Sequence, residues 1–205
     1  MEQESVGVGP HPTPWPNGSE YDRGMLENGD RRNVLDKYRY WSTAAIKADL
    51  DVSRLPLEIA VENLSRDFNM GTIVRNANAF NVRSVHIIGR KQWNRRGAMV
   101  TDLYMNIFYY PDVSSFIQSM RQRNKQVLAI DIVAGSKPLS EVSLPLDAVM
   151  VFGAEGPGLS NELRTEADAV IHIEQFGSTR SVNVGVASGI AMYAWMQKHA
   201  LTHQI

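Results

Sequence analysis

The chain has 205 residues, of which 43% are hydrophobic and 21% are charged, so it can bury a sizeable core, most simply as one domain with a tail. It contains no cysteine, which excludes disulfides and thiolate chemistry. No apolar run reaches the length of about 18 residues that a membrane span needs, and no apolar signal core follows the first residues, so we expect a cytoplasmic protein.

The formal net charge of −1 conceals an uneven distribution. Residues 1–30 contain six acidic side chains against Arg23, a balance of −5, which leaves +4 for the rest of the chain. A mildly basic body is compatible with a polyanionic partner. Residues 1–30 also contain four prolines and five glycines with almost no apolar clustering, so we expect them to form a disordered tail.

Residues 31–49 fit an amphipathic helix, because Val34, Tyr38, Trp41 and Ala45 recur at helical spacing along one face. Such a helix either packs on its own domain or forms an arm that touches a partner subunit or RNA. We therefore expect a disordered tail (1–30), an N-terminal helical arm (31–54) and a single larger domain (55–205).

From residue 55 onward, short apolar runs alternate with helical patterns. We expect strands at residues 57–61, 84–88, 107–110, 126–132, 149–152 and 169–173. We expect helices at residues 70–80, 113–123, 161–167 and 183–199. This alternation predicts an α/β fold with a mostly parallel sheet and helices on both faces. Ligands of such sheets bind beyond the carboxyl ends of the strands.

The loop after the first of these strands contains Asn69 and, six residues later, Arg75. Asn69 is a good helix N-cap, and Arg75 falls in the second helical turn, near the carboxyl edge of the sheet. The planar guanidinium of Arg75 offers a fork of donors suited to a phosphate. The alternative is that Arg75 is an ordinary surface charge.

A glycine-rich loop follows the expected strand at 149–152. Its glycines at 153, 156 and 158 permit a ligand to approach the backbone closely. Glu155, in the middle of the loop, would repel phosphates, so an uncharged or cationic ligand fits better than a nucleoside triphosphate. Ser160 is placed to cap the next helix, with Leu163 pointing inward.

The last segment, residues 171–195, starts as an apolar strand, crosses the polar loop 175–180 and enters a helix rich in small residues. Glycines inside a helix, here Gly185 and Gly189, cost stability relative to alanine. They indicate either close packing in the core or the approach of a ligand. The backbone around residues 173–181 could clasp a flat ring.

Basic side chains surround an aromatic one between the first two loops. Residues 83–96 contain five basic residues, no acidic residue and Trp93. Such a mixture suits an RNA strand, through phosphate contacts and base stacking, although a solvated loop is the alternative. The candidate RNA-binding residues are Arg66, Arg75, Arg83, Lys91, Arg95 and Arg96.

In their order and spacing, the three loops resemble the three motifs of the SpoU/TrmH branch of the SPOUT RNA 2′-O-ribose methyltransferases. The first motif of that family has an Asn and, six residues later, an Arg, as at Asn69 and Arg75. The second is a Gly-x-Glu-Gly loop, as at residues 153–156. The third ends in Ser-Leu-Asn-Val-Ser, where residues 181–185 read Ser-Val-Asn-Val-Gly. The resemblance covers residues 57–201.

The resemblance implies a C-terminal trefoil knot, which no pattern argument would have predicted. It also implies S-adenosyl-L-methionine held by backbone groups of the knot, and a homodimer formed through the knot region. The implied cofactor-binding residues are Ile130, Gly153, Glu155, Gly158, Ile173, Ser181 and Asn183. The expected product is RNA with a 2′-O-methylated ribose.

The catalytic positions implied by the resemblance are Arg75, Asn69, Glu155 and Asn183. The Arg of the family is proposed as a base. A guanidinium, however, has a pKa above about 12 and therefore stays protonated at neutral pH. We therefore expect Arg75 to bind a neighbouring phosphate and orient the hydroxyl, near the cofactor of the other subunit. Glu155 and Asn183 support the loops, and a direct base role for Glu155 is the alternative.

Two positions depart from the family's pattern. Gly185 replaces the usual second Ser of the third motif, and Asn76 replaces the Thr common after the Arg, which bears on substrate fit more than on activity.

The family's frequent N-terminal RNA-binding domain does not fit into residues 1–54. We expect tRNA as the substrate, with ribosomal RNA or a non-catalytic RNA-binding role as alternatives. The five histidines show no metal-ligand spacing, so no metal is expected. No membrane partner is expected either, because no apolar run is long enough to span one.

Overall fold

The computed structural model describes residues 7–63, 69–153 and 158–201. These residues fall into two compact units that divide between Ser53 and Arg54. The C-terminal unit contains the sheet and the loops with the candidate motifs. None of the helices over the described residues combines the length and the hydropathy needed to cross a bilayer.

The N-terminal unit is organised around the buried carboxylate of Asp30. Its oxygens accept hydrogen bonds from Arg32 Nε at 2.9 Å, from Arg32 Nη2 at 2.8 Å and from the backbone N–H of Tyr40 at 3.0 Å. Burial raises the pKa of Asp30, but these hydrogen bonds and the charge of Arg32 outweigh it and lower the pKa to about 2. The Asp30 backbone also pairs with Val8 in an antiparallel bridge.

This unit corrects two expectations. Its helices are α1 (Arg23–Asn28), η1 (Asp36–Tyr38) and α2 (Thr43–Val52). The expected tail over residues 1–30 is wrong for residues 7–30. The expected helix over 31–49 is confirmed for residues 43–49, which belong to α2, and is wrong for residues 31–42. Instead of lying on a helical stripe, the Trp41 ring packs against Tyr38 and Tyr21, at centroid distances of 5.5 and 6.5 Å. Polar contacts and aromatic packing, rather than apolar periodicity, order these residues.

The C-terminal unit is built on a seven-stranded sheet with the order β3-β2-β1-β6-β4-β7-β5, in which all neighbours are parallel. The strands are β1 (Leu55–Asn63), β2 (Val82–Gly89), β3 (Ile107–Tyr110), β4 (Gln126–Ile130), β5 (Lys137–Pro138), β6 (Ala148–Phe152) and β7 (Ala169–His172). Central β6 is buried along its whole length, as expected of a strand covered on both faces. The predicted parallel α/β sheet is confirmed, and only the short β5 was not anticipated.

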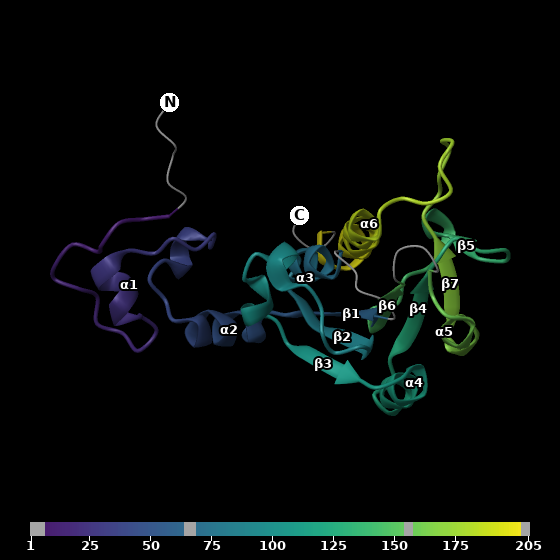
Figure 1. Ribbon diagram of the computed structural model, residues 1–205, viewed down its shortest axis with the longest axis horizontal. Helices are drawn as coiled ribbons and strands as arrows, with labels where there is room; N and C mark the ends of the chain where they lie inside the picture. Colours follow the sequence, from purple (N-terminus) through teal and green to yellow (C-terminus); the bar gives the residue numbers. More distant parts are fainter. Residues whose placement is uncertain (1–6, 64–68, 154–157, 202–205) are drawn as a thin grey trace. The chain divides into compact units, whose positions relative to one another are not determined.

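Helices cover both faces of this sheet (Figure 1). On one face lie α3 (Met70–Ala79) and α6 (Val184–Met196), which share a core cluster with alternate residues of β1. On the other lie α4 (Val113–Gln122) and α5 (Asn161–Glu166), whose Phe116 and Leu163 belong to a second cluster. The expected helices agree with these, except that α6 ends at Met196 and a π-helical stretch, Gln197–Leu201, follows. Short 3-10 helices, η2 (Arg95–Ala98), η3 (Thr101–Tyr104) and η4 (Leu139–Glu141), complete the unit.

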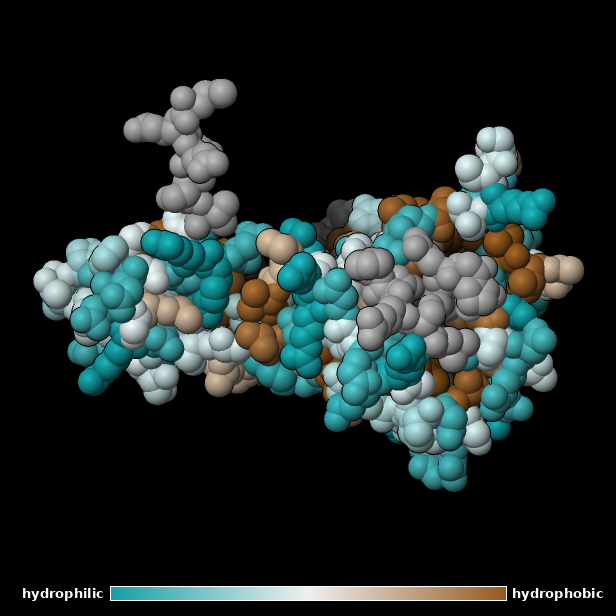
Figure 2. Space-filling view, viewed as in Figure 1, coloured by the Kyte–Doolittle hydropathy of each residue, from teal (hydrophilic) through white to brown (hydrophobic). Residues whose placement is uncertain are grey.

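The two sides of α6 differ in character. Toward α3 it presents small residues, and a Cβ on Gly185 would lie 2.8 Å from Thr72 Cγ2. The predicted close packing of this helix is therefore confirmed. Its other side is apolar and exposed, with Val186, Ile190 and Tyr193 exposing 54%, 41% and 47% of their surface. Figure 2 shows hydrophobic side chains at the surface where α6 lies in Figure 1.

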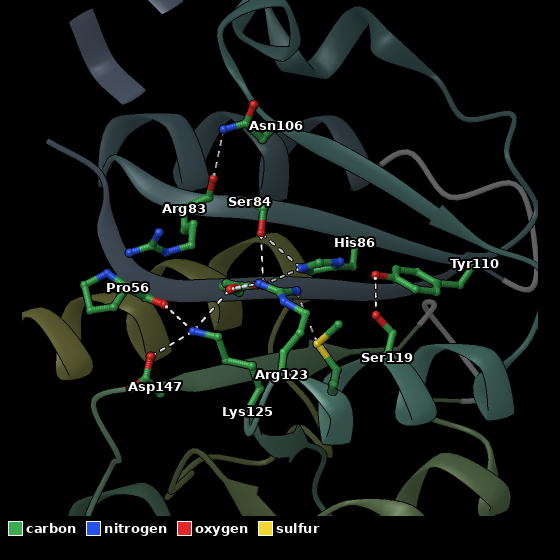
Figure 3. Close-up of polar contacts among 12 residues, drawn as sticks. Pro56, Arg83, Ser84, His86, Asn106, Tyr110, Ser119, Arg123, Lys125 and Asp147 are labelled. Carbon is green, nitrogen blue, oxygen red and sulfur yellow. Dashed lines mark hydrogen bonds and ion pairs between the residues drawn. The ribbon is translucent and has the colours of Figure 1, made fainter. Parts of the chain in front are cut away.

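A buried carboxylate, Glu58, anchors the amino-terminal half of β1. Its partners Ser84, His86, Arg123 and Lys125 are labelled in Figure 3. It contacts His86 Nε2 at 2.7 Å, Arg123 Nη2 at 2.5 Å and Lys125 Nζ at 3.2 Å, and accepts a hydrogen bond from the Ser84 hydroxyl at 3.1 Å. Burial raises the pKa of Glu58, but the hydrogen bonds from His86 and Arg123 lower it to about 2. The cluster joins β1 and β2 to the connection between α4 and β4, away from the strand ends that carry the candidate loops.

Candidate functional site

The carboxyl ends of three neighbouring strands, β4, β6 and β7, open into one cavity of about 700 Å³. Residues of the loop between β7 and α6 also line this cavity. Six of the predicted cofactor-binding residues lie on its wall, namely Ile130, Gly153, Gly158, Ile173, Ser181 and Asn183. The structure thus gathers residues far apart in the sequence at the edge where parallel sheets bind their ligands.

Two glycines let the ends of the glycine-rich loop meet. A Cβ on Gly153 would overlap the backbone carbonyl group of Gly158, so no larger residue fits there without a backbone shift. Gly158 itself has a φ of +68°, which side chains rarely tolerate. Glu155, predicted to act in catalysis and in cofactor binding, lies outside the described residues.

The residues just after this loop are held by the sheet and by α5. The Ser160 hydroxyl accepts a hydrogen bond from the backbone N–H of Leu163 at 3.1 Å, which confirms the predicted cap. The Ser160 backbone N–H donates to Glu62 Oε2 at 2.7 Å, at the carboxyl end of β1. Because Glu62 is buried, this bond fixes the return of the loop against the centre of the sheet.

Asp131 and Arg164 are charged residues of the cavity that the sequence interpretation missed. Asp131 Oδ2 accepts hydrogen bonds from Arg164 Nη1 at 2.9 Å and from the backbone N–H of Leu159 at 3.2 Å. The pair holds the Leu159 backbone at the cavity wall and offsets the charge of the carboxylate. An acidic residue directly after the buried strand β4 is the sequence signal that could have identified Asp131.

The first and third motifs meet through two asparagines. Asn183 Nδ2 donates a hydrogen bond to Asn69 Oδ1 at 3.0 Å. Asn183 Oδ1 meanwhile accepts from the backbone N–H groups of Gly185 and Val186, at 2.9 and 3.3 Å, and so caps α6. Asn69 occupies the N-cap position of α3, as predicted, but its side chain makes no capping hydrogen bond. A tertiary partner takes the place of the local one.

The two departures from the family's pattern are coupled in space. Asn76 Nδ2 donates hydrogen bonds to the Gly185 carbonyl oxygen at 2.9 Å and to Ser188 Oγ at 3.1 Å. At position 185 a side chain would crowd Thr72, as its Cβ would lie 2.8 Å from Thr72 Cγ2. Asn76 therefore links α3 and α6 at a point where their close approach favours glycine.

Arg75 lies apart from this cavity. It is exposed on α3 and does not line the cavity. No hydrogen bond or ion pair of its side chain occurs among the residues that the structure describes. Within the cavity wall, the basic side chains are Arg164, which is paired with Asp131, and Arg180 of the loop between β7 and α6.

The predicted RNA-binding residues do not all lie together. Arg95 and Lys91 are exposed after the carboxyl end of β2, and they lie over the rings of Trp93 and Tyr109, at 5.7 and 4.9 Å from the centroids. Arg96 is exposed in the same loop. Buried Asn63 secures the loop, because its Nδ2 donates to the carbonyl oxygens of Arg90 and Gln92 at 2.5 and 3.2 Å.

Arg83 is not part of this group. Arg83 lies at the amino end of β2, the opposite edge of the sheet, so the structure does not bring it to the others. Arg66 falls outside the described residues.

The profile of the SpoU rRNA Methylase family matches residues 56–193 of the chain. A tRNA/rRNA methyltransferase of Mycolicibacterium smegmatis, itself uncharacterized, is 30% identical over 146 residues, which make up 66% of this chain and 45% of the relative. A tRNA (guanosine(18)-2′-O)-methyltransferase of Thermus thermophilus is 26% identical over 142 residues, or 67% of this chain and 72% of the relative. The chain thus spans about half the length of several curated relatives that it matches.

Solved structures share the fold. The TrmH/SpoU tRNA modifying enzyme of A. aeolicus superimposes with a TM-score of 0.69 at 24% identity, over 78% of this chain and 83% of that one. An AdoMet-bound rRNA methyltransferase from Sinorhizobium meliloti superimposes with a TM-score of 0.63 at 25% identity, over 75% of this chain and 60% of that one.

Proposed function

This chain belongs to the SpoU rRNA methylase family, and on that premise we propose that it transfers a methyl group from S-adenosyl-L-methionine to a ribose 2′-hydroxyl of RNA. The observation that carries the proposal is the meeting of the second and third motifs in one cavity, with the first motif joined to them through the bond between Asn69 and Asn183. A non-catalytic copy would have no need to keep these residues in contact.

The cavity suits the proposed cofactor in size and lining. Its volume of about 700 Å³ falls within the range of roughly 300–1,000 Å³ typical of small-molecule sites. Gly153 and Gly158 both lie on the cavity wall, where their backbones meet with no Cβ between them. Ile130 and Ile173 would hold the flat part of the ligand between apolar walls. The charge of Asp131 is offset by Arg164, so the pair leaves no net charge in this part of the cavity.

When bound, S-adenosyl-L-methionine supplies a methyl group already activated by a positively charged sulfur. The task of the protein is then to align this group with the hydroxyl, and alignment of two reactants contributes roughly 7–11 kcal/mol. Asn183 serves that task by fixing both the start of α6 and the loop that carries Asn69. We assign Arg75 to the phosphate beside the target ribose, where its planar fork would orient the hydroxyl. We assign Glu155 a supporting role in its loop.

Arg75 would act in the cavity of a second copy of the chain. It is exposed and absent from the cavity of its own subunit, so a site within one subunit would lack it. The exposed apolar side of α6, at Val186, Ile190 and Tyr193, offers a surface for such a homodimer. The proposal includes a trefoil knot in the C-terminal segment, as the family implies.

Mixed dimers test this arrangement directly. We expect Arg75→Ala and Gly153→Ala homodimers to be inactive, the second through loss of cofactor binding. In a mixture of the two, the Arg75→Ala subunit keeps an intact cavity and its partner keeps an intact Arg75. Activity should therefore return in the mixture if Arg75 serves the partner's cavity. No recovery, with mixed dimers shown by native mass spectrometry, would place Arg75 in its own subunit's reaction or outside the reaction.

We propose tRNA as the substrate and ribosomal RNA as the second candidate. The Thermus thermophilus relative carries a tRNA-modifying name, and the exposed loop with Lys91, Arg95 and Arg96 offers charge for a folded RNA. The test is transfer of labelled methyl groups to tRNA and to ribosomal RNA, each isolated from a strain in which the gene has been deleted. Labelling of ribosomal RNA alone would reverse the choice. Binding of S-adenosyl-L-methionine without transfer to either would favour a non-catalytic role.

A further inference from the structure

A single aromatic side chain stands almost entirely in solvent beside the cavity. Phe176 is 98% exposed, more than any other large hydrophobic residue of the described chain. It lies in the loop between β7 and α6, which projects from the C-terminal unit (Figure 1). A single exposed apolar side chain is common on protein surfaces. Phe176 differs by its place, because the loop that carries it begins and ends at residues of the cavity wall.

The base of this loop belongs to the cavity. Ile173 and Gln175 on one side of Phe176, and Arg180 and Ser181 on the other, line the cavity wall. Glu174 fixes the start of the loop, because its Oε1 accepts a hydrogen bond from the backbone N–H of Ser140 at 3.3 Å. Along the chain Phe176 therefore lies between residues of the cavity wall, while its own ring is not part of that wall.

The composition of the loop favours a nucleic acid as its partner. The loop has one acidic residue, Glu174, whose carboxylate accepts a hydrogen bond from the Ser140 backbone. Residues 175–183, around Phe176, contain Arg180 and no acidic residue, together with serine and threonine hydroxyls. Single-stranded RNA is typically held by aromatic rings that stack on bases and by basic groups that meet phosphates. The space around the Phe176 neighbour Gly177 is open, with no atom within 4 Å of a Cβ placed there, so a flat partner has room beside the ring.

The proposed reaction supplies the reason for such a contact. A ribose can reach a recessed methyl donor only if its nucleotide leaves the regular stack, and the unstacked base then needs a new surface. We propose that Phe176 stacks on the base of the target nucleotide or its immediate neighbour, with Arg180 meeting the adjoining phosphate. This inference rests on the proposed function. It assigns to Phe176 a role in RNA binding and in the choice of nucleotide, apart from the chemical step.

Three variants separate stacking from simple apolar contact. Phe176→Trp keeps a stacking surface, Phe176→Leu keeps apolar volume without an aromatic face, and Phe176→Ala removes both. With bulk tRNA from the gene-deleted strain as substrate, we expect Phe176→Leu and Phe176→Ala to raise the KM for RNA roughly tenfold, as expected for the loss of one stacked base. Phe176→Trp should stay within about twofold of the parent. Phe108→Leu, which changes a half-exposed aromatic residue of β3, is the matched control and should leave this KM unchanged.

Two further measurements test whether the Phe176 ring contacts the cofactor or a second subunit instead of RNA. Affinity for S-adenosyl-L-methionine, by calorimetry, should be the same in all four variants, since a loss confined to Phe176→Leu and Phe176→Ala would show that the ring covers the cofactor. The mass in solution, by light scattering, should also be unchanged, since dissociation would show that the ring contacts a second subunit. Equal KM values for the parent and Phe176→Leu would overturn the inference while leaving the proposed function intact. A parent protein that methylates no RNA would overturn the proposed function itself.

Discussion

The buried Glu58 cluster allows a stability prediction worked from the structure. The Glu58 carboxylate is completely buried among His86, Arg123 and Lys125, and its pKa falls from 4.5 to about 2. Since a tenfold change in proton affinity corresponds to about 1.4 kcal/mol, this drop corresponds to about 3 kcal/mol of folding free energy. Replacement by glutamine removes the charge and leaves the cations facing a neutral group, so Glu58→Gln should destabilise the protein by about 3 kcal/mol at pH 7.

The pH dependence of this loss has a definite sign. The folded protein holds a proton on Glu58 less readily than the unfolded chain, because the pKa is lowered on folding. The stabilisation is therefore complete above a pH of about 5 and disappears as the pH falls toward 2. The difference in unfolding free energy between the parent and Glu58→Gln should shrink over that window.

Urea unfolding followed by circular dichroism, at pH 7, 5, 4 and 3 and at one protein concentration, measures this difference. Asp147→Asn is the matched control, because Asp147 pairs with the same Lys125 at 2.9 Å but is largely exposed. Exposed ion pairs contribute about 0–1 kcal/mol, so Asp147→Asn should change the free energy of unfolding by less than about 1 kcal/mol. A Glu58→Gln difference that stays constant from pH 7 to pH 3, or that matches the control at pH 7, would refute the reasoning.

Three further predictions concern the site and its supporting helices. Gly153→Ala should abolish binding of S-adenosyl-L-methionine in a calorimetric titration, because the added Cβ would overlap the Gly158 backbone. Binding at parental affinity would contradict the role of this loop in cofactor binding. Arg75→Lys should lower turnover with RNA at least about tenfold at unchanged cofactor affinity, because lysine keeps the charge and loses the planar fork; a parental rate would remove Arg75 from its assigned role. Gly71→Ala should cost about 1–3 kcal/mol in urea unfolding, since its Cβ would lie 2.6 Å from the Ala98 backbone nitrogen. Gly177→Ala, which meets no atom within 4 Å, is the control for that measurement and should be nearly neutral.

The sheet could be predicted from the sequence because burial dictates its pattern. Strands covered on both faces need continuous apolar runs, and the helices between them need one apolar face. The short β5 escaped notice, since two residues are too few to show a pattern. The ordered structure of the N-terminal unit could not be predicted for another reason. It depends on the ion pair between Asp30 and Arg32 and on aromatic contacts, which produce no periodic pattern in the sequence.

The site could be predicted only in part. The glycines and Asn183 were accessible from spacing and from the family resemblance, and the structure places them on one cavity. The pairing of Asn69 with Asn183 joins residues 114 positions apart, so no local rule could favour it over a helix cap. Asp131 was accessible from its place directly after β4, whereas Arg164 became recognisable only through its ion pair with Asp131.

The identity of the methylated nucleoside tests the central claim most directly. Bulk tRNA from the gene-deleted strain is incubated with the protein and S-adenosyl-L-methionine, digested to nucleosides and analysed by mass spectrometry. We predict one new nucleoside whose additional methyl group fragments with the ribose. A new methyl group that fragments with the base, at a rate dependent on Asn183 and Gly153, would contradict it.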